Sequence, residues 1–208
     1  MGGKRWRIVR TVRLAALCVA LFVVLSACDW TLFGYDVAHT RSSPDTSVAA
    51  SVVGTLSAKW SVKGGGASSP AVANGKVYVG SEDHHLDVYD AVTGAPVWSA
   101  PAAGGFSSPA VANGIVYVGS ADHNVYAFNA STGAGVWTVA TGGVVSSSPV
   151  VVNGIVYVGS ADHDVYALNA ATGAGVWTVA TGGAVESSPV VVNGIVYVGS
   201  GEHHVYAL

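Results

Sequence analysis

The stretch GIVYVGSADHDVYALNAATGAGVW, residues 154–177, occurs forty residues earlier as GIVYVGSADHNVYAFNASTGAGVW, residues 114–137. Over the longer pair of segments 107–143 and 147–183, five of 37 positions differ. Two short motifs extend the repeat in both directions: Ser-Ser-Pro, with its proline at Pro70, Pro109, Pro149 and Pro189, and Asn-Gly, beginning at Asn74, Asn113, Asn153 and Asn193. Self-similarity at a fixed period of about 40 residues is the signature of a repeat architecture.

Each unit predicts four short antiparallel strands. In the third unit these are SPVVV, IVYVGS, VYAL and AGVWTVA, rich in β-branched and aromatic residues at alternating positions. Asn-Gly closes a two-residue hairpin between the first two, because both residues tolerate positive φ. No stretch combines helical periodicity with capping signals. A four-stranded antiparallel unit of this length is typical of one blade of a β-propeller, so we expect an all-β fold.

The repeat resembles the pyrroloquinoline-quinone-type propeller family, whose pattern is roughly G-x-V-Y-V-G-S-x-D-x-x-x-Y-A-L-D/N-x-x-T-G-x-x-x-W. The resemblance covers residues 67–208, and residues 29–47 are similar to the segment that leads into the first blade of such proteins. In that family each Trp packs between blades against the Thr-Gly turn of a neighbour. The resemblance therefore implies a structural, blade-docking role for Trp98, Trp137 and Trp177 with Thr93, Gly94, Thr132, Gly133, Thr172 and Gly173.

The repeats occupy residues 56–208 and begin near residues 68, 107, 147 and 187. The last unit contains three predicted strands, whereas residues 56–66 are predicted to form a lone outer strand with Trp60 in the Trp position. We expect about four blades, with this N-terminal strand completing the last one and closing the ring. Two alternatives stay open. The family usually builds seven or eight blades, so the chain is part of a longer ring, or two chains pair through open edges into eight blades.

The N-terminus predicts export and lipidation. A basic segment, MGGKRWRIVRTVR, precedes an apolar run of fourteen residues, LAALCVALFVVLSA. This run is shorter than the ~20 residues of a membrane span and typical of a signal-peptide core. Leu25–Cys28, LSAC, resembles the lipobox of bacterial lipoproteins, which implies a signal peptide over 1–27, lipidation of Cys28 and a lead-in segment over 28–55. The alternative is an uncleaved signal anchor.

Asp29 resembles an inner-membrane retention signal. In a cell with two membranes it places the chain on the periplasmic side of the inner membrane, and otherwise the anchor implies the cell surface. From residue 28 onward four basic residues oppose twelve acids, 4 − 12 = −8. Residues 28–208 contain no basic patch, which excludes nucleic acid as a partner, since phosphate contacts need clustered Lys and Arg.

Four histidines occupy one equivalent position in the repeat: His84, His123, His163 and His203. With the acids beside them (Asp83, Asp122, Asp162 and Glu202) they are candidates for a ring of metal ligands. Zinc requires Zn–N distances of about 2.0–2.1 Å, which side chains spread around a ring cannot reach together. We interpret these histidines instead as residues at positive φ, where His, Asn and Asp are enriched, and expect no metal.

No catalytic arrangement is recognisable. The Ser-Ser-Pro serines have no His or Asp at a spacing typical of an activated nucleophile, and Glu186 has no second positioned group for acid–base chemistry. Alcohol-oxidising members of the family carry a vicinal disulfide, an aspartate base and calcium ligands in a much longer ring, and these have no counterpart here. We therefore expect neither catalysis nor a bound pyrroloquinoline quinone.

The sequence predicts a lipid-anchored, extracytoplasmic scaffold that binds other envelope proteins or peptides. The same resemblance includes the propeller lipoprotein of the outer-membrane β-barrel assembly machinery, which is a protein of this kind. The alternative is a fragment of a quinone-dependent dehydrogenase.

Overall fold

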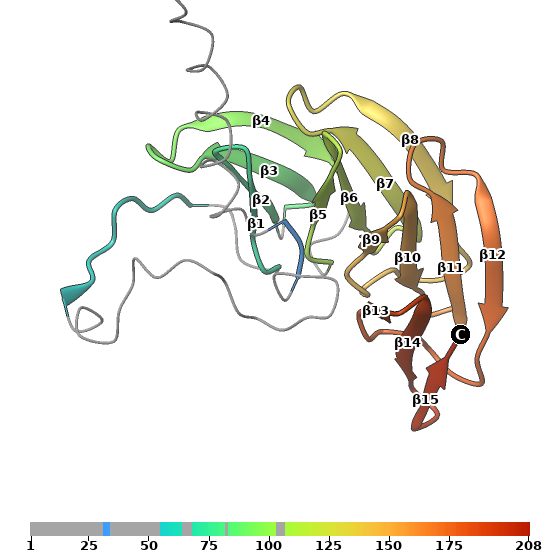
Figure 1. Cartoon of the computed structure of the whole chain (residues 1–208). Coiled ribbons are helices and arrows are strands. Elements are labelled where there is room, and N and C mark those ends of the chain that lie inside the picture. The colour runs from blue at the N-terminus through green and yellow to red at the C-terminus, as the bar shows by residue number, and fades with distance from the viewer. Residues whose placement is uncertain (1–30, 34–54, 64–67, 82, 103–106) are drawn as a thin grey trace, which may run out of the picture.

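The computed structural model describes residues 31–33, 55–63, 68–81, 83–102 and 107–208 (Figure 1). The predicted signal peptide, the lipidation site at Cys28 and residues 34–54 of the lead-in segment lie outside this part of the chain. Within it, no helix has the length and apolar character needed to cross a bilayer.

The described residues form four antiparallel sheets whose strands follow one another in chain order. Three sheets have four strands and the last has three, and we number them blades 1 to 4. Blade 1 contains β1 (Ala71–Ala73), β2 (Lys76–Gly80), β3 (His85–Asp90) and β4 (Pro96–Pro101). Blade 2 contains β5 (Ala110–Ala112), β6 (Ile115–Gly119), β7 (Asn124–Asn129) and β8 (Gly135–Ala140). Blade 3 contains β9 (Val150–Val152), β10 (Ile155–Gly159), β11 (Asp164–Asn169) and β12 (Gly175–Ala180), and blade 4 contains β13 (Val190–Val192), β14 (Ile195–Ser200) and β15 (His204–Ala207).

The turns within each blade follow from the repeated sequence. In blade 3, Val152 pairs with Ile155 across the Asn-Gly hairpin, where Asn153 has φ 51° and Gly154 has φ 77°. Two successive residues at positive φ give the turn a twist that matches the strands it joins. The expected all-β propeller architecture is thus confirmed, with about four blades.

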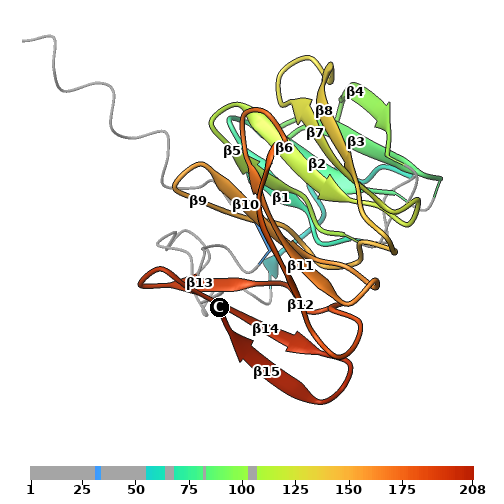
Figure 2. The ribbon, with the colours of Figure 1, turned by 90° about the vertical axis from the view of Figure 1, so that its right-hand side faces the viewer.

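The blades are arranged as an arc. The short first strands β1, β5, β9 and β13 are neighbours in this order on the inner side, and the longer strands fan outward (Figure 1). Seen from the side, blades 1 and 2 overlap at one end of the molecule, blade 3 lies beside them and blade 4 lies at the other end (Figure 2). On the inner side, the Thr31 carbonyl accepts a hydrogen bond of 2.6 Å from the Val111 amide in β5, and Leu32 is buried in the cluster of Ala110 and Val150.

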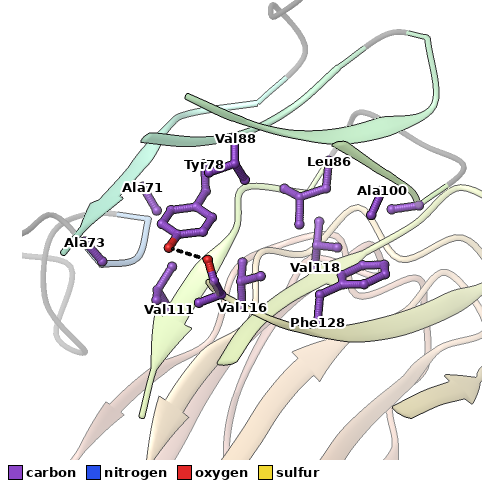
Figure 3. Packing of buried hydrophobic residues seen from close by; sticks show 12 residues of the cluster. Ala71, Ala73, Tyr78, Leu86, Val88, Ala100, Val111, Val116, Val118 and Phe128 are labelled. Atoms are coloured by element: carbon purple, nitrogen blue, oxygen red, sulfur yellow. Dashed lines mark hydrogen bonds between the residues drawn. The ribbon is translucent and has the colours of Figure 1, made fainter. Parts of the chain in front are cut away.

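The core consists of apolar residues between successive blades. Between blades 1 and 2, Tyr78, Leu86 and Val88 face Val116 and Val118 (Figure 3). All five are at most 1% exposed. Burying one such aliphatic side chain stabilises the fold by roughly 1.5–3 kcal/mol, so each joint between blades stabilises the fold.

One expectation was wrong. Residues 56–66 were predicted to form the outer strand of the last blade and close the ring, but residues 55–63 form no strand and the sheet of blade 4 has three strands. The reason is that Trp60 binds blade 1, through a hydrogen bond of 3.1 Å from its Nε1 to the Ala91 carbonyl. Blades 1 and 4 lie at opposite ends of the arc, so this segment is far from β15 in the same chain (Figure 1).

Candidate functional site

Three of the described tryptophans, Trp60, Trp98 and Trp137, lie on Thr-Gly turns of blades 1, 2 and 3. The Trp98 indole packs on Gly133, where a Cβ would fall 2.8 Å from Trp98 Cδ2, so only glycine fits. Trp137 packs on Gly173 in the same manner, and Trp60 on Gly94. Each indole Nε1 also donates a hydrogen bond to a carbonyl of the blade it contacts, as Trp137 does to Ala170 at 2.9 Å. Trp177 contacts Tyr157 of its own blade, with ring centroids 5.8 Å apart.

The Thr-Gly turn is held by the residue that ends the preceding strand. In blade 3, Asn169 Oδ1 accepts hydrogen bonds from the amides of Ala171 and Thr172 and from the Thr172 hydroxyl. In blade 1, Asp90 takes this place, and hydrogen bonds from Thr93 and then Val92 lower the pKa of its carboxyl below the usual value. These hydrogen bonds fix the turn on which the indole packs.

The four histidines are not brought together. All are exposed, and their backbones are left-handed: the φ values are 71° at His84, 71° at His123, 78° at His163 and 69° at His203. The His123 carbonyl accepts a hydrogen bond of 2.7 Å from the Thr141 amide, so the backbone there also fixes the end of the outer strand. Across the described ranges, no group of three or more His, Cys, Asp or Glu side chains is placed to hold a metal ion.

The acids beside these histidines form a second contact between blades. Asp162 Oδ2 accepts hydrogen bonds from the Tyr166 hydroxyl at 2.6 Å and from the Gly142 amide at 2.5 Å. Gly142 lies in the loop that follows the outer strand of blade 2, so the carboxylate links that loop to blade 3. Glu202 repeats the arrangement in blade 4, with Tyr206 and the Gly182 amide as donors. We call this contact the carboxylate clasp.

The clasp shifts the ionisation of both its members. Partial burial opposes ionisation of Asp162, but hydrogen bonds from Tyr166, Asp164, Ser160 and Gly142 outweigh it and lower the pKa of the carboxyl. Burial, together with donation to the carboxylate, raises the pKa of the Tyr166 hydroxyl. An ionised carboxylate that accepts several hydrogen bonds is a structural acceptor, and a phenol with a raised pKa is a poor general base.

The Ser-Ser-Pro serines connect the inner ends of the blades. The fully buried Ser147 Oγ donates to the Ser187 carbonyl at 2.9 Å and accepts from the Gly159 amide at 3.0 Å. The Ser107 hydroxyl makes the same pair of contacts one blade earlier. Because the hydroxyl proton is committed to a carbonyl, these serines lack the activation that a nucleophile needs. Glu186 is exposed in the loop before β13.

Sequence reasoning missed the carboxylate clasp. Its signal is an acid followed four residues later by tyrosine, at Asp162–Tyr166 and Glu202–Tyr206. Asp122–Tyr126 has the same spacing without the third contact, because the residue twenty positions upstream is Ala102, whose amide donates to the His84 carbonyl. The spacing is readable, but the third partner, a Gly amide twenty residues upstream, belongs to another blade. The recurring polar groups thus hold neighbouring blades together.

Comparison with known proteins supports this view of the repeat. The profile of the family described as outer membrane protein assembly factor BamB matches residues 44–148 and 121–208, which confirms the resemblance drawn from the repeat. No curated protein matches the chain in sequence. Many solved structures do match, among them BamB from Moraxella catarrhalis, with 26% identity and a TM-score of 0.59 over 64% of this chain and 42% of that chain.

Two further structures share the fold alone. Quinohemoprotein alcohol dehydrogenase from Comamonas testosteroni is 23% identical, with a TM-score of 0.72 over 83% of this chain and 35% of that chain. The computationally designed Ika4 protein is 18% identical, with a TM-score of 0.65 over 74% of this chain and 98% of that chain. The chain therefore spans less than half the length of these two natural proteins, BamB and the dehydrogenase.

Proposed function

The chain belongs to the family of outer membrane protein assembly factor BamB, and from this membership we propose that it is a non-catalytic propeller that binds other proteins during assembly of the cell envelope. The observation that carries the proposal is the family match over residues 44–208, which includes all four blades. The carboxylate clasp and the buried serines support it, because the groups most suited to chemistry are occupied in structural hydrogen bonds. Recognition then falls to the loops and exposed apolar residues.

We further propose that the propeller is anchored to a membrane through a lipid on Cys28. The hydrogen bond between Thr31 and Val111 fixes the lead-in segment to β5. Thr31 lies three positions after Cys28 in the sequence, and a chain of that length spans at most about 10 Å. A lipid on Cys28 would thus hold the inner side of blade 2 close to the bilayer and turn the outer strands away from it.

The anchor can be tested with a matched pair of cysteine variants. Cys28→Ala should abolish incorporation of a labelled fatty acid and release the chain from the membrane fraction. Cys18→Ala is the control, since it lies in the segment that the signal-peptide prediction removes. Equal labelling of both variants would refute lipidation at Cys28.

The assembly role can be tested in the organism of origin. We expect deletion of the gene to lower the amount of folded outer-membrane β-barrel proteins, and expect the full chain to restore it. In-cell cross-linking of the full chain should join it to components of the assembly machinery. Normal β-barrel levels together with no cross-link to that machinery would refute the proposal.

The second candidate is a fragment of a quinone-dependent dehydrogenase, favoured by the likeness to the Comamonas testosteroni enzyme. At 23% identity that likeness carries the fold alone. The two functions separate in one assay: the full chain with pyrroloquinoline quinone and Ca²⁺ should not reduce an electron-accepting dye in the presence of alcohols. Alcohol-dependent reduction would favour the dehydrogenase.

A further inference from the structure

The lead-in segment contacts the inner side of the blades through its backbone and one apolar side chain. The Val111 amide in β5 donates a hydrogen bond of 2.6 Å to the Thr31 carbonyl. Leu32 is 7% exposed and belongs to an apolar cluster with Ala110 and Val150, from the inner strands of blades 2 and 3. Figure 1 shows the segment in blue beside β5. A short piece of polypeptide is thus a ligand that this surface already accepts.

The hairpin geometry explains why β5 offers this amide. Ala112 and Ile115 flank the two-residue Asn-Gly turn and form a hydrogen-bonded pair. Pairs alternate along an antiparallel ladder, so the next one, Val111 and Val116, exchanges no hydrogen bonds. The Val111 N–H and C=O therefore point away from β6, toward the inner side. Unpaired backbone groups at the edge of a sheet can bind another segment of polypeptide.

The inner strands of the neighbouring blades repeat this geometry. Val72 pairs with Val77, and Val151 with Val156, at the equivalent place in the ladder. The amides of Val72 and Val151 therefore also point to the inner side, and neither donates to a described residue outside its own blade. The inner strands read AVA in blades 1 and 2 and VVV in blade 3, without a charged residue. The inner side thus combines backbone hydrogen-bond donors with aliphatic surface.

We propose that the inner side of blades 2 and 3 is a binding site for a peptide segment of a partner protein, one that presents a backbone carbonyl followed by a leucine-sized apolar side chain. Residues 31–33 occupy this site as an internal ligand, and the partner binds by displacing them. The proposal rests on the proposed function in that the ligand is a protein. It adds the place and the chemistry by which that protein is held.

The chemistry of the site favours a peptide over other ligands. The amide of Val111 selects a carbonyl oxygen, and the apolar cluster around Leu32 selects an aliphatic side chain beside it. A peptide supplies both in consecutive residues, whereas a charged ligand meets no counter-ion on these inner strands. The Thr31 carbonyl occupies the amide of β5, and the amides of Val72 and Val151 remain available to a longer segment. A longer partner segment can therefore exceed the contacts of the internal ligand.

A peptide-binding assay on the full chain in mild detergent tests the site. The probe is a fluorescently labelled peptide with the sequence of residues 30–36, WTLFGYD, and both ends blocked. Leu32→Asp in the chain should expel the internal ligand, because its bound position would bury an unpaired carboxylate. An internal competitor acts at a high effective concentration, so its removal should tighten binding of the peptide by roughly tenfold or more.

A second peptide separates specific binding from general apolar attraction. The same peptide carrying Leu32→Asp should bind the Leu32→Asp chain roughly tenfold or more weakly than the first peptide does. Equal binding of the two peptides would overturn the proposal, and so would equal binding of the first peptide by chains with and without Leu32→Asp. Leu32→Ala in the chain adds no charge and should change binding in the same direction by a smaller factor. This variant keeps the test valid if Leu32→Asp prevents cooperative unfolding.

The repeat supplies a matched pair of backbone variants. Val111→Pro removes the donor without breaking the ladder, because this amide points away from β6. In the Leu32→Asp chain it should weaken peptide binding about two- to tenfold, as expected for the loss of one hydrogen bond. Val151→Pro makes the same change in the next blade, where the Thr31 carbonyl does not bind, and should leave the affinity unchanged. Equal effects of the two prolines would overturn the assignment of the site to β5.

Failure of this site and failure of the assembly role are distinguishable. No peptide binding, together with β-barrel levels that depend on the gene, would overturn the inner-side site and leave the assembly role standing. Specific peptide binding, together with β-barrel levels that do not change on deletion and no cross-link to the assembly machinery, would support the site and refute that role.

Discussion

Gly133→Ala should destabilise the joint between blades 1 and 2 more than a Gly→Ala substitution at any other turn of blade 2. Two costs combine at this position. Gly133 has φ 74°, and a left-handed backbone costs an L-residue roughly 1–2 kcal/mol. The added Cβ would also lie 2.8 Å from two atoms of the Trp98 indole, and such overpacking costs typically about 1–3 kcal/mol. The expected loss is therefore about 2–5 kcal/mol in the free energy of unfolding.

Two neighbouring glycines separate these costs. Gly114 has φ 76° with nothing within 4 Å of the point that an added methyl group would occupy, so Gly114→Ala should show the backbone cost alone. Gly135 has open space and no positive φ, so Gly135→Ala should be nearly neutral. Thermal unfolding of the full chain in detergent, followed by tryptophan fluorescence, gives the comparison. For a chain of this size each kcal/mol shifts the midpoint by about 2–4 °C, so Gly133→Ala should melt roughly 2–12 °C below Gly114→Ala. Equal midpoints for Gly114→Ala and Gly133→Ala would refute the proposed packing of Trp98 on the turn.

Three further outcomes are expected. Tyr166→Phe removes one hydrogen bond of the carboxylate clasp and should cost about 0.5–1.5 kcal/mol in urea unfolding, whereas Tyr157→Phe, whose hydroxyl has no partner among the described residues, should be nearly neutral. Because the folded-state pKa of Asp162 is lowered, its stabilisation is present above the unfolded pKa and is lost as pH falls through the folded pKa. Acid titration of stability should thus be shallower for Asp162→Asn, and an unchanged slope would contradict the assignment. Ser147→Ala leaves the buried Gly159 amide without its hydrogen-bond acceptor and should cost about 1–3 kcal/mol, while the exposed Ser131, which is alanine in the next repeat, should tolerate alanine.

Much of the architecture could be predicted from the repeat because its signals are local. Asn-Gly at a forty-residue period specifies hairpins through backbone preference alone, and alternation in segments such as IVYVGS determines which residues face a neighbouring sheet. The four histidines at positive φ follow from the same local preference. A four-stranded unit cannot bury both faces of its sheet alone and must stack on its copies. The propeller class could therefore be predicted as well.

Only part of the candidate site could be predicted from the sequence. That the serines lack a catalytic partner is visible in the sequence, but the acceptor of the Ser147 hydroxyl is a carbonyl forty residues away in another blade. The carboxylate clasp likewise joins Asp162 to an amide twenty residues upstream, across the boundary between blades. Contacts between blades depend on how far one sheet is rotated against the next, and no local pattern encodes that angle.

By itself, the sequence determined the all-β fold, the blade as its unit, the turn residues and the packing role implied for the tryptophans. Only the tertiary structure decided that the four blades form an open arc and that Trp60 lies on blade 1 instead of completing the last sheet. Strand and turn geometry arise from neighbouring residues and repeat identically in each unit. Closure depends on the sum of small rotations at successive joints between blades, a quantity that exists only once the blades are packed together.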